Sequence, residues 1–256
     1  MFVNVAANKT APFFLEATVK RLVFLLTTAA VLIIRSAQAQ QAPPVTGFKD
    51  NSAPLFFQET WKHDYSGPTE GPLTQKHVGS PNLELKLYGD QGRRNPDGGI
   101  WENQTGPNDP PHSYTGTCRT NCALTLRHRT SYVDLTGNAK LKWRTRISRF
   151  RYLHPIIKLA DGKAYVGDYA ETFRSSGDYV ETEIGFADIK WLPLDLTQVL
   201  LDGNNSFVEN LDLTKVDEVG FTDLAPGSST SHGAAARSNV DWIEVYGKAV
   251  PRTGTN

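Results

Sequence analysis

Hydrophobic and polar positions alternate along most of the chain from residue 123 onward. The clearest case is residues 140–147, where Lys or Arg alternates with Leu, Trp, Thr and Ile. A period of two is typical of a β-strand that buries one face. The same kind of pattern predicts further strands over residues 124–133, 153–159, 164–169, 179–186, 191–194, 216–221 and 239–246.

Polar turns separate the predicted strands. Asp161-Gly162 is the central pair of a hairpin turn, and Asp134–Gly137 forms another turn. A helical pattern is brief and covers only Asp195–Leu201. Many short strands with polar turns between them predict an all-β fold, specifically an antiparallel β-sandwich or jelly roll.

The N-terminal 39 residues have a different pattern, which predicts export. Lys20 and Arg21 precede an apolar run over residues 22–34, and Ala37-Gln38-Ala39 matches a signal-peptidase site. The run is shorter than the roughly 20 residues of a membrane-spanning helix. Arg35 keeps an uncleaved anchor open as the alternative. We therefore expect a secreted or periplasmic protein with no stable membrane span after cleavage.

The predicted organisation has four parts. Residues 1–39 form the signal peptide, although a start at Val19 would make residues 1–18 a gene-calling artefact. Residues 40–54, rich in Gln, Ala and Pro, form a flexible leader. Residues 55–250 form a single β-sandwich domain, and residues 251–256 form a tail.

Charge and cysteine content narrow the range of partners. The chain has 27 basic and 27 acidic residues, and residues 40–256 hold 23 basic and 26 acidic ones, a net charge near −3. This balance argues against nucleic acid as a partner. Cys118 and Cys122 can form a disulfide in an oxidising compartment, with a metal site as the weaker alternative. No cofactor is predicted, and a structural calcium is left open.

Three segments in a fixed order resemble a known fold family. They are Val133–Gly137 with the strand that follows, Leu213–Phe221, and Val240–Gly247 with its Val-Asp-Trp-Ile-Glu-Val-Tyr-Gly sequence. Their order resembles galactose-binding-like jelly rolls, in particular CIA30-type domains and carbohydrate-binding modules. It is also similar to a set of secreted bacterial proteins. The resemblance implies fold better than function, and no catalytic residue is carried over from it.

Cations are concentrated in residues 127–158. If the strand with Arg127 and Arg129 pairs with the strand of Arg144 and Arg146, one sheet face carries a row of cations. Guanidinium groups bind carboxylates with two parallel hydrogen bonds, so this face would suit an acidic, uronate-containing glycan. The alternative is a solvated face whose cations pair with carboxylates on neighbouring strands, such as Glu181 and Glu183.

Residues 89–117 are dense in Gly, Pro, Asn and Asp, which predicts a long ordered surface loop. Trp101 is the best candidate for an exposed aromatic platform, because Trp143 and Trp242 have the apolar parity of core residues. The candidate substrate-binding residues are Arg127, Arg129, Arg144, Arg146, Lys158, Trp101, His112 and Tyr114.

Candidate catalytic residues follow from two reactions. Elimination at a uronate needs a cation to neutralise the carboxylate, a base and an acid, which His154 and Tyr169 could supply. Hydrolysis needs two carboxylates, for which Asp168 and Glu181 are the candidates. A single His on a strand is more often a hydrogen-bonded structural residue.

These observations predict a secreted carbohydrate-active protein that acts on or binds a polysaccharide or oligosaccharide, with a basic sheet face as the site. Whether it is an enzyme is open; a polysaccharide lyase or a glycoside hydrolase are the enzyme classes that fit. The alternatives are a non-catalytic carbohydrate-binding protein and a periplasmic structural or assembly protein.

Overall fold

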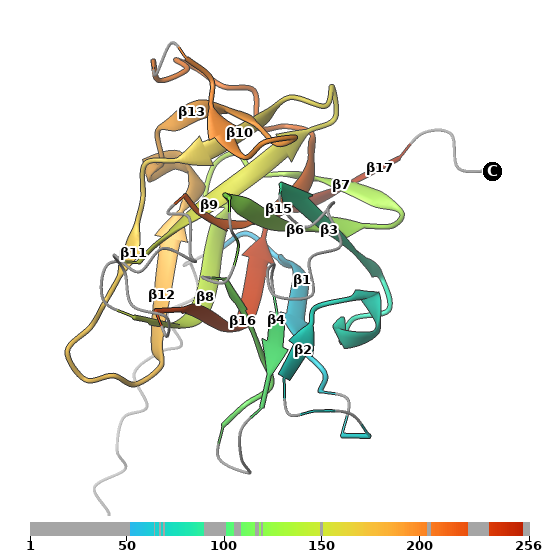
Figure 1. Cartoon of the computed structure of the whole chain (residues 1–256). Helices are drawn as coiled ribbons and strands as arrows, with labels where there is room; N and C mark the ends of the chain where they lie inside the picture. The colour runs from blue at the N-terminus through green and yellow to red at the C-terminus, as the bar shows by residue number, and fades with distance from the viewer. Residues whose placement is uncertain are drawn as a thin grey trace, which may run out of the picture. The chain divides into compact units, whose positions relative to one another are not determined.

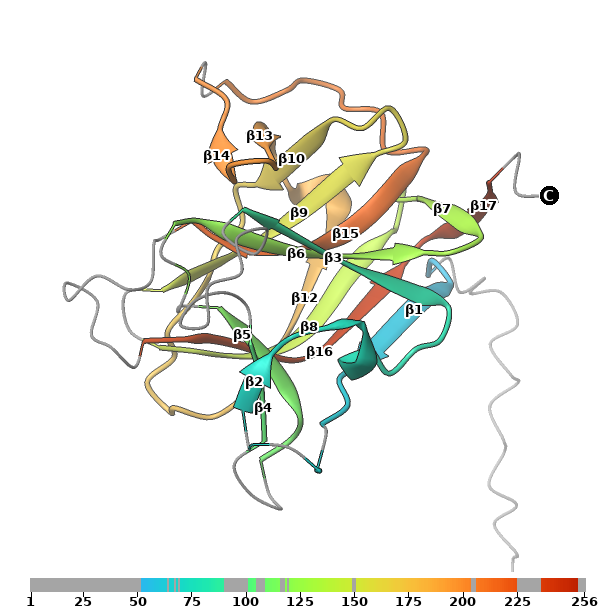
Figure 2. The ribbon, with the colours of Figure 1, turned by 45° about the vertical axis from the view of Figure 1, so that its right-hand side comes forward.

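The computed structural model describes residues 52–252, apart from residues 64, 67, 69, 90–100, 105–108, 116–117, 119, 149–150, 204–205 and 225–235. The elements described are β-strands and two short 3-10 turns, Gln75–His77 and Phe186–Asp188. The strands form two antiparallel sheets, A and B, that face each other (Figures 1 and 2). The predicted fold class, an all-β antiparallel sandwich, is therefore confirmed. The described part contains no helix of membrane-spanning length and apolarity.

Sheet A is built around two long neighbouring strands, β8 and β16. The strand β12 pairs with the free side of β8, while β1 and β5 pair with different halves of the other side of β16. Its strands are β1 (Leu55–Thr60), β2 (Glu70–Pro72), β4 (Trp101–Asn103), β5 (His112–Thr115), β8 (Lys140–Ile147), β12 (Val180–Gly185) and β16 (Ser238–Tyr246).

Sheet B is built around β9 and β15. Figure 2 shows β6, β9 and β15 of this sheet above β8 and β16 of sheet A. Its strands are β3 (Leu83–Gly89), β6 (Cys122–His128), β7 (Ser131–Asp134), β9 (Tyr152–Leu159), β10 (Ala164–Gly167), β11 (Glu171–Thr172), β13 (Trp191–Asp195), β14 (Leu200–Leu201), β15 (Val216–Asp223) and β17 (Lys248–Pro251).

The main core lies between the two sheets and is filled by the inward positions of their strands. Trp143 of β8 is fully buried there, as its alternation predicts, together with Leu124 of β6 and Ile243 of β16. Burying each such side chain stabilises the fold by roughly 1.5–3 kcal/mol. The hairpin between β9 and β10 has Gly162 at φ 91°, a conformation that glycine adopts without strain.

A second apolar cluster lies on the other side of sheet B. Ala123 and Ile156 have the opposite parity to the main-core residues of their strands, and both are fully buried. Leu196 and Val199, from the turn between β13 and β14, pack with them. The side-chain amide of Asn121 donates a hydrogen bond of 2.8 Å to the carbonyl of Val199. This turn therefore covers part of the outer face of sheet B.

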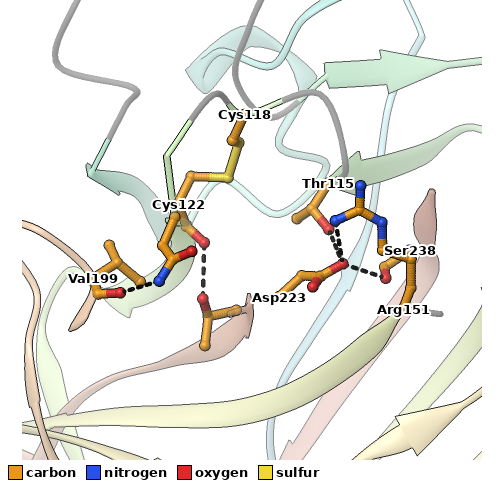
Figure 3. Close-up of a disulfide and its surroundings, with 9 residues drawn as sticks. Thr115, Cys118, Cys122, Arg151, Val199, Asp223 and Ser238 are labelled. Atoms are coloured by element: carbon orange, nitrogen blue, oxygen red, sulfur yellow. Dashed lines mark hydrogen bonds and ion pairs between the residues drawn. A yellow bond between two sulfur atoms is a disulfide. The ribbon is translucent and has the colours of Figure 1, made fainter. Parts of the chain in front are cut away.

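The two sheets are also linked by a buried carboxylate near the disulfide. The predicted Cys118–Cys122 bridge is present, with Cα atoms 6.2 Å apart. Nearby, Asp223 of sheet B pairs with Arg151 and accepts a hydrogen bond of 3.0 Å from Ser238 of sheet A, as Figure 3 shows. A buried charge that keeps its partners resists separation of the sheets at this end.

Three predicted elements differ from the observed ones. The predicted strand 124–133 is interrupted at residues 129–130, so that β6 and β7 are separate strands. The predicted helix Asp195–Leu201 is a turn, because Asp195 accepts hydrogen bonds from the backbone and hydroxyl of Thr197. The predicted loop 89–117 contains β4 and β5, whose neighbours in sheet A supply their hydrogen bonds.

Candidate functional site

The strand β8 presents its cations on the outer face of sheet A, the face that points away from the core. Cross-strand partners on β12 and β16 extend this face on both sides of β8. The side chains that it presents across β1, β16, β8 and β12 are Gln58, Thr60, Trp242, Glu244, Tyr246, Lys140, Lys142, Arg144, Arg146, Glu181 and Glu183.

A β-bulge in β16 places Trp242 on this outer face. Val240 pairs with Thr145, whereas Trp242 pairs with the adjacent residue Arg144, so Asp241 is an extra residue on β16. One extra residue shifts the alternation of side chains by one position. Val240 is consequently buried in the core, and Trp242 points outward and is partly exposed. The prediction that Trp242 is a core residue is wrong for this reason.

Beside Trp242 lies a compact group of polar side chains around one aromatic ring. The guanidinium carbons of Arg144 and Arg146 lie 4.8 and 4.5 Å from the ring centre of Tyr179. Arg144 donates a hydrogen bond to Asp241, and Arg146 forms an ion pair of 3.6 Å with Asp109. We call these five residues the Tyr179 cluster.

Burial controls the charges in and around the Tyr179 cluster. Burial raises the pKa of Asp241 above its ordinary value, although Arg144 acts in the opposite direction. Burial also raises the pKa of Tyr179, so its hydroxyl stays protonated. The neighbouring His112, 3.9 Å from Asp109, has a pKa lowered by burial and is neutral near pH 7. The cluster therefore holds two cations and two carboxylates.

Two residues predicted for an exposed loop lie in β5 and are buried instead. His112 and Tyr114 are each about 1% exposed. Tyr114 donates a hydrogen bond of 3.1 Å to Glu70, and the guanidinium of Arg237 lies 4.2 Å from its ring centre. The backbone of Trp101 pairs with that of Tyr114, while the side chain of Trp101 lies outside the described residues.

The two lysines of β8 are paired with a carboxylate of the neighbouring strand. Glu183 lies 3.1 Å from the ammonium of Lys140 and 2.9 Å from that of Lys142. The hydrogen bond from Lys142 lowers the pKa of Glu183. A hollow of about 630 Å³ adjoins this pair, lined among others by Gly137 and Asp188. This pairing matches the predicted alternative of a solvated face with paired cations.

The predicted single row of cations is not formed, because β6 and β8 belong to different sheets. The strand β6 pairs with β3 and β15, and β8 pairs with β12 and β16. Arg127 pairs with Asp217 and Glu84, and Arg129 donates a hydrogen bond to the carbonyl of Pro81. Of the predicted binding residues, Arg144 and Arg146 therefore lie together, and Arg127 and Arg129 lie elsewhere.

The predicted catalytic residues are also separated. His154 lies on β9, and its Nδ1 is 3.2 Å from the carbonyl oxygen of Gly167. Asp168 is exposed and accepts a hydrogen bond of 2.9 Å from the backbone of Lys190. Both contacts are those of structural residues at the end of β10.

The other two predicted catalytic residues lie on different sides of sheet A. Tyr169 packs 6.2 Å from the ring of Trp143 and donates a hydrogen bond of 2.8 Å to the buried Glu171. Burial and Glu171 together raise the pKa of Tyr169 to about 12. Glu181 lies on the outer face of sheet A. The structure does not bring the four candidates together into one constellation.

A different buried carboxylate lies on the outer face of sheet B. Glu218 accepts hydrogen bonds from Tyr88 at 2.7 Å, from Lys158 at 3.0 Å and from Thr125. Burial and Glu218 raise the pKa of Tyr88 to about 12. Tyr88 and Lys158 border a hollow of about 360 Å³ beside Leu196. The predicted binding residue Lys158 is thus committed to an internal network.

The residues that the structure describes contain no candidate metal site. Across the described ranges, no group of three or more His, Cys, Asp or Glu side chains is arranged to hold a metal ion. The two cysteines are joined to each other.

Sequence reasoning missed Trp242, Tyr179, Asp109 and Asp241. The pattern of β16 does not by itself define the bulge, because a bulge exists only relative to a partner strand. The sequence predicts Tyr179 only as the first residue of the strand 179–186. The local signal is the pair of adjacent apolar residues Trp242 and Ile243, which interrupts the alternation that Val240-Asp241-Trp242 begins.

Comparisons with known proteins give fold-level likenesses only. No protein-family profile matches the chain, and no curated protein matches it. Among solved structures, the Family 11 carbohydrate-binding module from Clostridium thermocellum, in complex with a β-1,3-1,4-mixed-linked tetrasaccharide, is 17% identical. The match covers 78% of this chain and 100% of that one, with a TM-score of 0.35.

Two further structures are similar at comparable or lower levels. The Family 11 module of the cellulosomal cellulase Lic26A-Cel5E of Clostridium thermocellum is 16% identical over 77% of this chain and 98% of that one, with a TM-score of 0.35. An inactivated mutant β-agarase B in complex with agaro-octaose is 9% identical over 76% of this chain and 86% of that one, with a TM-score of 0.26. Neither these nor the first is a CIA30-type domain, and matches of this size identify no function for the chain.

Proposed function

We propose that the protein binds a glycan on the outer face of sheet A. The observation that carries the proposal is the orientation of Trp242, which the bulge at Asp241 turns outward beside Arg144. An indole ring offers a broad apolar surface that can lie against the C–H face of a sugar ring. Binding sites for polar ligands combine such surfaces with a few fixed hydrogen-bonding groups. The adjoining Tyr179 cluster supplies these groups.

The extent of the face suits a chain better than a single sugar. The row of cross-strand partners Thr60, Trp242, Arg144 and Glu181 crosses four strands. Neighbouring strands are about 4.8 Å apart, so the row is roughly 14 Å long. Since this exceeds the width of one sugar ring, the proposed ligand is a polysaccharide or an oligosaccharide.

Binding without catalysis is the form of the proposal that the geometry favours. His154, Asp168, Tyr169 and Glu181 lie in separate places, and three of them are outside the outer face of sheet A. A lyase or hydrolase needs its acid and base around one bond. We therefore propose a carbohydrate-binding protein and keep enzymatic turnover as an outcome of the test.

A secreted or periplasmic location is part of the proposal. It is supported by the export pattern that ends at Ala39 and by the Cys118–Cys122 bridge, which is suited to an oxidising compartment. Comparison of the N-terminus of the purified protein with Gln40 tests the predicted cleavage. An intact protein that starts at Met1 after expression in an exporting host would contradict it.

Affinity electrophoresis in gels that contain a panel of polysaccharides tests the binding proposal. We expect at least one polysaccharide to retard the protein, and Trp242→Ala to weaken that retardation by about tenfold or more, because an aromatic anchor carries a large share of binding energy. Phe207→Ala is the matched control: it removes an aromatic side chain that is 47% exposed outside sheet A. This control should bind like the unmodified protein.

Two results would contradict the proposal. One is the absence of retardation by every polysaccharide in the panel. The other is equal retardation of the Trp242→Ala variant and the unmodified protein. Circular dichroism must show that Trp242→Ala and the control Phe207→Ala are folded. Measurement of reducing ends and of the ultraviolet absorbance of unsaturated products, on the same panel, reports hydrolysis or elimination. Either product would replace the binding-only form with an enzyme.

A further inference from the structure

Every cation of β8 has a carboxylate partner within the described part of the protein. Lys140 and Lys142 share Glu183, and the two arginines have one Asp each in the Tyr179 cluster. Glu181 and Glu244 add two more carboxylates to the face. The face that the sequence predicts to be basic therefore has five carboxylates for the four cations of β8, and no excess of positive charge.

The members of the Tyr179 cluster differ in how far a ligand can reach them. The side chains of Arg144 and Arg146 are 34% and 38% exposed, whereas those of Asp241 and Asp109 are only 10% and 14% exposed. A ligand on this face thus meets guanidinium N–H groups whose charge is already compensated from behind. Such groups act as directional donors more than as attractors of distant anions.

The hydroxyl of Tyr179 is a second indication of a ligand. It is buried and has no hydrogen-bond partner among the residues that the structure describes. A buried polar atom without a partner is unusual and costs stability, unless a water molecule or a ligand group satisfies it. The hydroxyl belongs to the ring on which both guanidinium groups stack, so a ligand hydroxyl that bonds to it also lies near Arg144 and Arg146.

We infer that the outer face of sheet A selects a neutral glycan, whose hydroxyl groups bond to the Tyr179 cluster, over an acidic one. A uronate carboxylate would compete with Asp241 and Asp109 for guanidinium groups that they already hold. It would also approach a surface on which these carboxylates outnumber the cations of β8. This inference rests on the proposed function and names the class of ligand at the same face.

The experiment compares two neutral polysaccharides, hydroxyethylcellulose and galactomannan, with two acidic ones, polygalacturonate and alginate. We expect retardation by a neutral polysaccharide that does not change between about 0.05 and 0.5 M NaCl, because screening weakens only net charge attraction. Retardation by the acidic polysaccharides alone, released by salt, would overturn the inference and leave glycan binding intact. Two other results would instead count against the proposed function. One is that none of the four polysaccharides retards the protein. The other is that the Trp242→Ala variant is retarded as strongly as the unmodified chain.

A variant that removes the carboxylate partner of one guanidinium group sharpens the comparison between neutral and acidic polysaccharides. Asp241→Asn removes the charge behind Arg144, and we expect it to weaken retention by the neutral polysaccharide by about threefold or more. It should also gain salt-sensitive retention by polygalacturonate. Asp161→Asn is the matched control, since it makes the same charge change on an exposed hairpin of sheet B. Unchanged behaviour of the folded Asp241→Asn variant on both polysaccharides would overturn the role given to the cluster.

The test does not depend on one variant. If Asp241→Asn fails to fold, Asp109→Asn unmasks Arg146 in the same way. Tyr179→Phe removes only the buried hydroxyl and keeps the ring under both guanidinium groups. We expect it to weaken neutral-glycan retention severalfold without loss of stability, because the hydroxyl has no hydrogen-bond partner to lose among the described residues. Undiminished retention by Tyr179→Phe would overturn the role of this hydroxyl.

Discussion

Lys158, Glu218 and Tyr88 form an ionic and aromatic group on the outer face of sheet B, and the outer face of sheet A carries a group of the same composition. In sheet B the ammonium lies 3.0 Å from the carboxylate and 5.5 Å from the ring centre. In sheet A, Lys142 lies 2.9 Å from Glu183 and 5.6 Å from the ring centre of Tyr246. The two ammonium groups have nearly equal distances to carboxylate and ring, yet the Glu side chain is 2% exposed in sheet B and 49% in sheet A.

The difference arises from what covers each face. On sheet B, Leu196 and Val199 from the turn after β13 pack over the strands beside Ala123 and Ile156. On sheet A, the outward-pointing side chains of β8 and β12, and Trp242, Glu244 and Tyr246 of β16, remain at least partly exposed. The same residue types therefore act as an internal brace on one face and as a surface open to a ligand on the other. Residue type alone does not separate a binding site from a structural network.

The largest effect should follow removal of the covered carboxylate. Glu218→Ala leaves Lys158 without its charge partner and leaves the hydroxyls of Tyr88 and Thr125 without an acceptor. We expect the free energy of unfolding to fall by about 3–5 kcal/mol, measured by chemical denaturation. Retardation of the folded variant by the polysaccharide should be the same as that of the unmodified protein. A loss below about 1 kcal/mol, the range of an exposed pair, would remove the contrast between the two faces.

A third carboxylate tests whether burial or the sheet to which it belongs decides how strongly a carboxylate affects the free energy of unfolding. Glu59 belongs to sheet A but points inward, is fully buried, and accepts hydrogen bonds from the backbone of Gly79 and Ser80. Burial raises its pKa to about 7, although these bonds and Lys62 act in the opposite direction. The folded protein thus holds this proton more tightly than the unfolded chain does.

The sign of the pH dependence follows from this shift. The contribution of Glu59 to stability is complete below its ordinary pKa near 4.5 and is lost as the pH rises to about 7. The loss is on the order of 3 kcal/mol. Denaturation curves from pH 4.5 to 8 should show this decline, and Glu59→Gln should flatten it. An equal slope in Glu59→Gln would show that Glu59 does not titrate in this range.

The smallest effect should follow removal of the exposed carboxylate. Glu183→Ala breaks two ion pairs, with Lys140 and Lys142, but its side chain is about half exposed. We expect the free energy of unfolding to change by less than about 1 kcal/mol, because water replaces the lost contacts. Chemical denaturation beside Glu218→Ala gives the direct comparison. A loss as large as that of Glu218→Ala would mean that the outer face of sheet A is also a structural network.

Much of the strand content could be predicted from the sequence, and the candidate site could not. The alternation in β8 and the hairpin at Asp161-Gly162 are local patterns, and both are observed. By contrast, Arg127 and Arg144 were predicted on one face, and they lie in different sheets. His112 was predicted in an exposed loop, and it is buried in β5. Correct placement of these residues depends on which strands are neighbours, and local periodicity does not contain that information.

The sequence by itself determined an all-β fold, an export pattern, the spacing of Cys118 and Cys122, and the inward position of Trp143. These features depend on residues that are close together in the chain. Only the tertiary structure decided that Trp242 faces outward. Its side depends on the register between β16 and β8, where Asp241 is an extra residue only in relation to its partner strand. A bulge is a property of two paired strands, so the orientation of the residue after it is fixed by pairing across about a hundred residues of sequence rather than by the pattern around it.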